Sequence, residues 1–165
     1  MTEALDALTT RRSCRRFASR EIPRDLVEKI VNAGRLAATA RNEQPWEFIV
    51  VTDAAARRDV ARMTDHGTFI ADAPVCIVVL CKDTKYYLED GSAAAQNILV
   101  AAHALGLGAC WVAGDKKPYA PKVVQRLGAT PEFRLVALVA IGWPEGDLPK
   151  PPKRSLEDVM HWEKF

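Results

Sequence analysis

SAAAQNILVAAHALGLGACWVAG, residues 92–114, decides the fold, because it carries no charged residue over a length that raises the question of a membrane span. Three polar side chains, Gln96, Asn97 and His103, interrupt the run, and the Gly-Leu-Gly at 106–108 ends a helix before it could cross a bilayer. The pattern therefore predicts a buried helix that is followed by a buried strand, and no membrane segment.

The segments on either side of this run alternate between helical and strand patterns. Apolar residues recur at helical spacing from Leu26 to Ala37, and the helix at 54–63 is expected to carry its charges outward. Helices are predicted at about 3–9, 24–38, 54–63, 88–105 and 118–128, and strands at 46–53, 73–81, 109–114 and 134–142. The proline-rich tail after them has room for a last helical turn. With no repeat or linker, the chain is predicted to form one layered α+β domain over residues 1–165.

Composition and charge narrow the class of protein. Of the 165 residues 48% are hydrophobic, and 23 basic and 21 acidic side chains leave a formal net charge of +2. With this balance the protein as a whole has too little net positive charge to attract nucleic acid or a membrane, so neither is expected as a partner. The first ten residues lack the apolar core of an export signal, which predicts a cytoplasmic protein.

The cysteines point to buried thiols rather than to a metal. The four of them are scattered without Cys-x-x-Cys spacing, so no metal site is expected. Cys76 and Cys81 are five positions apart on one predicted strand and should face opposite sides of it. Cys14 lies among arginines that would lower its pKa, which leaves a reactive thiol open as an alternative.

Residues 11–17, RRSCRRF, concentrate four arginines in a chain with little net charge. Cations this close repel one another unless an anion or carboxylates neutralise them, although a solvated charge run is the other interpretation. The hydroxyl of Ser13 within the run favours a phosphate, and Phe17 would anchor the loop. A second basic group, Lys150, Lys153 and Arg154, could grip the same phosphate if the two ends of the chain meet.

Four motifs, taken in order, resemble the FMN-dependent nitroreductase family in its short single-domain branch. They are RRSCRRF at 11–17, RNEQPWEFIVV at 41–51, AAAQNILVAAHALGLGACWVAG at 93–114 and PPKRSLEDV at 151–159. The resemblance runs over nearly the whole chain. It implies a three-layer α/β/α sandwich whose central sheet, mainly antiparallel or mixed, is flanked by helices.

The resemblance also implies residues that bind FMN. Those expected at its phosphate and ribityl chain are Arg11, Arg12, Ser13 and Arg15, together with the second clamp of Lys153 and Arg154. Those expected to reach the flavin of the other subunit across a homodimer interface are Thr39, Ala40 and Asn42.

The resemblance further implies that the backbone N–H near Ala113 and Gly114 faces flavin N5, where glycine permits close approach. His66 is the imidazole candidate near the ring, and Trp111 either packs in the core or lines the flavin edge. The loops at 64–70 and 115–121 are expected to set substrate preference.

The implied activity needs no catalytic side chain, because the flavin carries the chemistry. NADH or NADPH would pass a hydride to N5 and leave, and a small electron acceptor such as a nitroaromatic or a quinone would take its place. Two other functions remain open: a flavin-binding sensor or carrier without turnover, and a patch that binds nucleic acid or another polyanion. The latter predicts salt-dependent affinity for nucleic acid without flavin.

Overall fold

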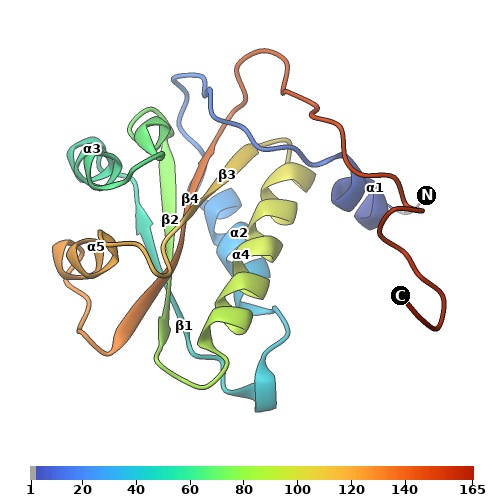
Figure 1. The fold of residues 1–165 in the computed structure, drawn as a ribbon. Helices are drawn as coiled ribbons and strands as arrows, with labels where there is room; N and C mark the ends of the chain where they lie inside the picture. The colour runs from blue at the N-terminus through green and yellow to red at the C-terminus, as the bar shows by residue number, and fades with distance from the viewer. Residues whose placement is uncertain (1–2) are drawn as a thin grey trace.

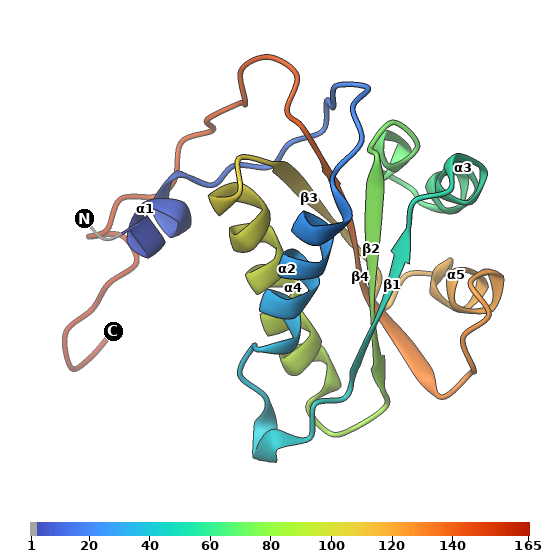
Figure 2. The same ribbon diagram turned by 180° about the vertical axis from the view of Figure 1, so that it is seen from behind.

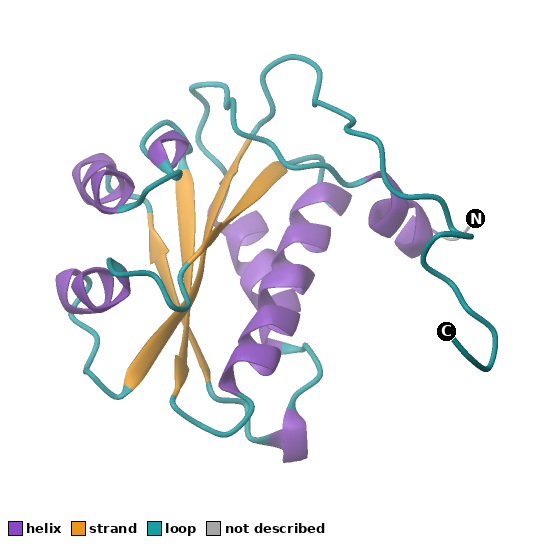
Figure 3. Cartoon of the chain, in the orientation of Figure 1, coloured by secondary structure: helices purple, strands orange, loops and turns teal. Residues whose placement is uncertain are grey.

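The computed structural model describes residues 3–165 (Figures 1 and 3). Its α-helices are α1 (Glu3–Thr10), α2 (Arg24–Arg35), α3 (Ala54–Met63), α4 (Tyr87–Ala104) and α5 (Ala120–Arg126). Its strands are β1 (Trp46–Val51), β2 (Val75–Lys82), β3 (Gly108–Ala113) and β4 (Phe133–Gly142), and two short 3-10 turns are η1 (Ala40–Asn42) and η2 (Thr68–Ile70). The long uncharged run is therefore α4 followed by β3, as the sequence predicts.

The strands form one sheet in the order β1-β2-β4-β3, and each neighbouring pair is antiparallel. Helices α2 and α4 cover one face of this sheet, and α3 and α5 cover the other (Figures 1 and 2). The predicted three-layer α+β fold is confirmed. The strand order leaves β3 at an outer edge, where its far side is open to a loop or a ligand.

Strand β2 shows how the sheet divides the core. Val75, Ile77, Val79 and Cys81 pack with α2 and α4, whereas Cys76, Val78 and Leu80 pack toward α3 and α5. Alternation along a strand explains this division, and it places Cys76 and Cys81 on opposite faces as predicted. Only Lys82 of this strand is exposed, because both faces are covered by helices.

Three local expectations are wrong. Helix α2 ends at Arg35 rather than near residue 38, and the tail beyond β4 forms turns without a helix. Prolines remove backbone donors from that tail, and its side chains from Pro149 onward are exposed, so little packing supports a helix there. Helix α3 does not carry every charge outward, because the guanidinium of Arg57 turns in and donates to the carbonyls of Ala71 and Ala73.

Among the described residues, no helix combines the length and the apolar character needed to cross a membrane.

Candidate functional site

The segment after α1 that carries the arginines runs along the outer edge of β3. Residues 11–17, which we call the arginine loop, make a bridge between Ser13 and Ala109, and the Cys14 N–H donates to the Ala109 carbonyl over 2.9 Å. At its end, Phe17 bridges to Pro144 and packs on Gly142, where an added Cβ would lie 2.7 Å from the ring. Backbone pairing and an apolar anchor thus fix the loop at both ends.

Cys14, a residue of this loop, is fully buried. Its thiol donates to the Arg16 carbonyl, and burial raises the pKa of Cys14. The reactive-thiol alternative is therefore wrong, because the side chain is buried in the core and its pKa is raised rather than lowered. Burial is the largest influence on its ionisation.

The two ends of the chain meet at a basic cavity of about 160 Å³. We call it the basic cavity, and it is lined by Arg11, Arg12, Ser13, Arg15, Pro149, Pro151 and Lys153. Among the residues that the structure describes, none with an acidic side chain lines it. Figure 1 shows the red tail crossing beside the blue segment that follows α1. Five of the six residues predicted at a phosphate therefore lie around one hollow.

Arg12 is held beside the basic cavity by bonds to the backbone. Its Nη1 donates to the carbonyls of Thr9 and Arg11, at 3.0 and 2.8 Å, whereas its buried Nε has no partner. The cavity itself is lined by Arg11, Arg12, Arg15, Ser13 and Lys153, whose side chains all carry hydrogen-bond donors. A phosphate group, with several acceptor oxygens, fits this set of donors.

Arg154 and Arg16 are not part of this cavity. The guanidinium of Arg154 donates to the Asp158 carbonyl within the tail. Arg16 forms an exposed ion pair with Glu145, with 3.7 Å between Nη2 and Oε2. Of the three tail cations that could grip a phosphate, Lys150, Lys153 and Arg154, Lys153 alone lines the hollow.

A second hollow, of about 180 Å³, borders the first at Arg15. We call it the aromatic cavity, and it is lined by Arg15, Asp65, His66, Phe69, Cys110, Trp111, Val112, Ala113, Lys117 and Tyr119. The loops at 64–70 and 115–121 both contribute to it. Lys117, which pairs with Asp65 over 3.4 Å, was not singled out by the sequence reasoning. In the sequence, Lys117 stands out only as part of the basic pair Lys116-Lys117, which follows Asp115 after the predicted strand at 109–114.

The backbone of β3 presents its outward groups to this region. The Gly114 N–H donates to the Val136 carbonyl of β4 over 3.1 Å, so the expectation of a free amide at Gly114 is wrong. In an antiparallel pair these directions alternate, which turns the N–H groups of Trp111 and Ala113 toward the free edge. Glycine at position 114 is explained by packing instead, because an added Cβ would lie 2.4 Å from Cγ of Leu135.

Thr39, Ala40 and Asn42 lie elsewhere, around η1, at the opposite end of the molecule from the arginine loop (Figures 1 and 2). The hydroxyl of Thr39 and the N–H of Ala40 both bond to the carboxylate of Asp90 on α4, at 2.8 and 3.0 Å. Within one chain these residues do not join the basic cavity.

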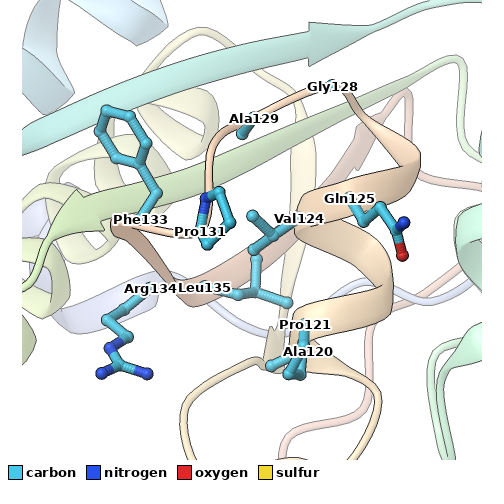
Figure 4. Close-up of a pocket in the computed structure, with 10 residues that line it drawn as sticks. All are labelled: Ala120, Pro121, Val124, Gln125, Gly128, Ala129, Pro131, Phe133, Arg134 and Leu135. Atoms are coloured by element: carbon cyan, nitrogen blue, oxygen red, sulfur yellow. The ribbon is translucent and has the colours of Figure 1, made fainter.

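A larger hollow, about 440 Å³, lies between α5 and the start of β4 (Figure 4). Its centre is formed by the apolar side chains of Val124 and Leu135. None of the residues predicted at a cofactor lines it. The candidate site is therefore assigned by its chemistry, at the two smaller hollows along β3.

The basic cavity offers hydrogen-bond donors, and the aromatic cavity beside it offers apolar surface along the edge of β3. This combination is typical of proteins that bind a ligand with a phosphate at one end and a planar ring at the other. Comparison with known proteins agrees with this. The model of the nitroreductase family matches residues 8–67 and 64–143. The chain belongs to the nitroreductase family.

Relatives of similar length align along the whole chain. A protein of Archaeoglobus fulgidus, named for NADH dehydrogenase or NAD(P)H nitroreductase activity, is 36% identical, and the alignment covers 100% of each chain. A protein of the same name from Methanothermobacter thermautotrophicus is 35% identical, over 99% of this chain and 88% of its own. A nitroreductase structure from Desulfovibrio desulfuricans in complex with FMN has 30% identity and a TM-score of 0.89, covering 100% and 99% of the two chains.

Proposed function

We propose that the protein is an FMN-dependent oxidoreductase that uses NADH or NADPH to reduce a small electron acceptor, such as a nitroaromatic or a quinone. The observation that carries this proposal is the basic cavity, where three arginines, a serine and a lysine from distant parts of the chain come together. The FMN complex of the Desulfovibrio desulfuricans relative and the names of the two archaeal relatives support it.

In this proposal the two cavities divide the cofactor between them. Arg11, Arg12, Ser13 and Lys153 bind the phosphate, and Arg15, which lines both hollows, lies where the ribityl chain passes from one to the other. The ring lies along the outer edge of β3, where Ala113 offers an outward N–H. The flavin supplies a site that accepts two electrons as a hydride and returns them, so the protein's task is to hold and orient.

The side chains of the aromatic cavity would receive the two substrates in turn. Trp111 and Phe69 provide apolar surface for a nicotinamide or an aromatic acceptor, and His66 and Lys117 provide donors at the rim. Reductant and acceptor would share one space, which predicts a ping-pong order in which each leaves before the other enters.

We further propose that the working unit is a homodimer of 165-residue, one-domain chains. Thr39, Ala40 and Asn42 lie away from the basic cavity of their own chain, and a second copy would bring them to the open side of the flavin. A sheet edge in a chain of this size covers one side of a tricyclic ring, and a partner would cover the other.

A spectroscopic experiment tests the activity. The purified protein, or the protein reconstituted with FMN, should be yellow, lose its visible absorbance on adding NADH or NADPH without oxygen, and regain it with a nitroaromatic or quinone. Bleaching by dithionite but not by either nicotinamide would replace the enzyme with a flavin carrier. A protein that cannot be reconstituted with FMN would overturn the proposal.

A matched pair of variants tests the phosphate assignment. Arg11→Ala removes a cavity cation and should raise the FMN Kd by roughly 10- to 100-fold, since a hydrogen bond to a charged group contributes about 1.5–3 kcal/mol. Arg58→Ala removes an exposed cation on α3 and should leave the Kd unchanged. Equal effects of the two substitutions would refute the assignment.

A further inference from the structure

We propose that Asp90 is a positioning residue whose buried carboxylate holds residues 39–44, here called the η1 loop, ready to meet the FMN of the second protomer. This inference rests on the proposed function for its consequence, but its structural part stands on contacts within one chain. It concerns a residue on α4 that lies outside both cavities and that the sequence reasoning did not single out.

Asp90 is only 4% exposed, and its carboxylate receives two donors from consecutive residues. Thr39 Oγ1 donates to Oδ2 over 2.8 Å, and the Ala40 N–H donates to Oδ1 over 3.0 Å. Each oxygen therefore holds one end of the same short segment. A fork of this kind fixes both the position and the orientation of the chain at the start of η1.

The hydroxyl of Thr39 extends this connection across the loop. It accepts the N–H of Gln44 over 3.0 Å while it donates to Asp90. The Gln44 amide can only donate, so the hydroxyl of Thr39 accepts from it and points its own proton to the carboxylate. The direction of donation therefore runs from Gln44 through Thr39 to Asp90. The two ends of the η1 loop are thus joined through one side chain and one buried acid.

The backbone of the loop explains why such a hold is needed. Arg41, Asn42 and Gln44 have φ values of 54°, 57° and 48°, in the left-handed region that residues with a Cβ adopt at a cost. Three such residues within four positions would relax if the loop were free. The bonds to Asp90 tie the loop to α4 and oppose this relaxation, together with the turn hydrogen bonds from Asn42 and Glu43 to the carbonyls of Thr39 and Ala40.

The η1 loop in turn provides the hydrogen-bond donors that the buried carboxylate of Asp90 requires. Among the described residues, Asp90 has no cation within ion-pair distance, and an isolated buried carboxylate is strongly disfavoured. Its place in the first turn of α4, where the helix dipole favours negative charge, and the two loop donors together stabilise it. The acid and the loop therefore order each other before any ligand binds.

This arrangement predicts pre-organised binding. Ala40 and Asn42 would be presented to the neighbouring flavin in their bound conformation, so little conformational entropy would be lost on binding. Releasing the loop should weaken FMN binding even though Asp90 touches no part of the cofactor.

Limited proteolysis tests the hold without any cofactor. The Arg41 side chain is 67% exposed, so trypsin can reach it, but the ordered backbone should protect the Arg41–Asn42 bond. In the full-length chain, Thr39→Val keeps the shape but removes the hydroxyl, and should speed cleavage there by about tenfold. Thr39→Ser restores the hydroxyl and should restore protection. Cleavage after Arg20, in an exposed loop elsewhere, should be equal in all variants.

Asp90→Asn is the direct test, because its amide turns an NH₂ toward one of the two donors. It should speed cleavage at Arg41 at least as much as Thr39→Val, and both should raise the FMN Kd by about tenfold and change the visible circular dichroism of the bound flavin. Thermal melting of each variant identifies any global unfolding, and Thr39→Val keeps the test valid if Asp90→Asn does not fold.

The possible outcomes separate this inference from the proposed function. The role of Asp90 would be overturned if trypsin cleaved after Arg41 equally slowly in the wild type, Thr39→Val and Asp90→Asn. It would also be overturned if Thr39→Ser were cleaved as fast as Thr39→Val. Faster cleavage with an unchanged FMN Kd would overturn its role in binding. If the wild-type chain binds no FMN, the proposed function falls, while proteolysis still decides whether Asp90 orders the loop.

Discussion

Gly108 at the start of β3 provides a sharp test of how the arginine loop is held. A Cβ added there would lie 2.5 Å from Cβ and 2.6 Å from Sγ of Cys14, well inside ordinary contact distance. The loop cannot withdraw freely, because the Cys14 N–H is bonded to the Ala109 carbonyl. Gly108→Ala therefore combines overpacking, roughly 1–3 kcal/mol, with loss of a backbone hydrogen bond of roughly 0.5–1.5 kcal/mol. We expect a total loss of about 2–4 kcal/mol in the free energy of unfolding, and an FMN Kd raised about tenfold by the displaced loop.

Denaturant unfolding and FMN titration measure these effects, and two further substitutions isolate the cause. Cys14→Gly in the Gly108→Ala background removes both clashing atoms and should restore much of the affinity, whereas Cys14→Ala keeps the Cβ at 2.5 Å and should not. Gly106→Ala is the matched control: Gly106 has φ +77° and nothing within 4 Å of its added Cβ, so we expect a loss of about 1 kcal/mol and unchanged FMN affinity. If Gly108→Ala is as stable as wild type, or if Cys14→Ala rescues as well as Cys14→Gly, the proposed packing of the loop is refuted.

Two further outcomes can be measured on the same protein. Lys153→Ala should raise the FMN Kd by about tenfold, whereas Arg154→Ala, whose side chain bonds within the tail, should leave it near the wild-type value; the reverse order in a fluorescence titration would move the clamp by one residue. Burial raises the pKa of Cys76 from 9.0 to about 12, so the folded chain holds this proton where the unfolded chain releases it. The stability that follows is fully present below pH 9 and is lost as the pH rises from 9 to 12. Burial also raises the pKa of Cys81 to about 12, so Cys76→Ala should reduce, and not abolish, the slope of the free energy of unfolding over this range; parallel profiles would exclude Cys76 as a contributor.

The sequence was sufficient for features that depend on local periodicity. The apolar runs at β2 and α4 predicted the buried centre of the fold, because their hydrophobic patterns match the strand and helix found there. It also predicted that the two basic ends could meet, since arginines and lysines at both termini suit one anion. Which tail cation reaches the hollow could not be predicted, because the prolines on either side leave the register of an irregular segment open.

Contacts between distant positions were beyond the sequence for a different reason. The hold of Asp90 on Thr39 joins residues 51 positions apart, and no pattern in either segment encodes the pairing. Cys14 was misjudged because its sequence neighbours are arginines, whereas its spatial neighbours are Gly108 and Cys110. The direction of the Gly114 amide depends on the register of β3 with β4, which a single strand cannot reveal.

The outer edge of β3 connects the fold to the proposed flavin chemistry. An edge strand leaves a row of N–H and C=O groups that proteins normally cover. Here the arginine loop covers one end through Cys14 and Ala109, and the Tyr119 hydroxyl donates to the Ala113 carbonyl at the other. Between them, the outward amides near Trp111 face the aromatic cavity. In the proposed function, a flavin whose ring edge carries acceptors would complete this part of the sheet edge. The main chain would then orient the ring, the arginine loop would fix its phosphate, and side chains would be left to choose the substrate.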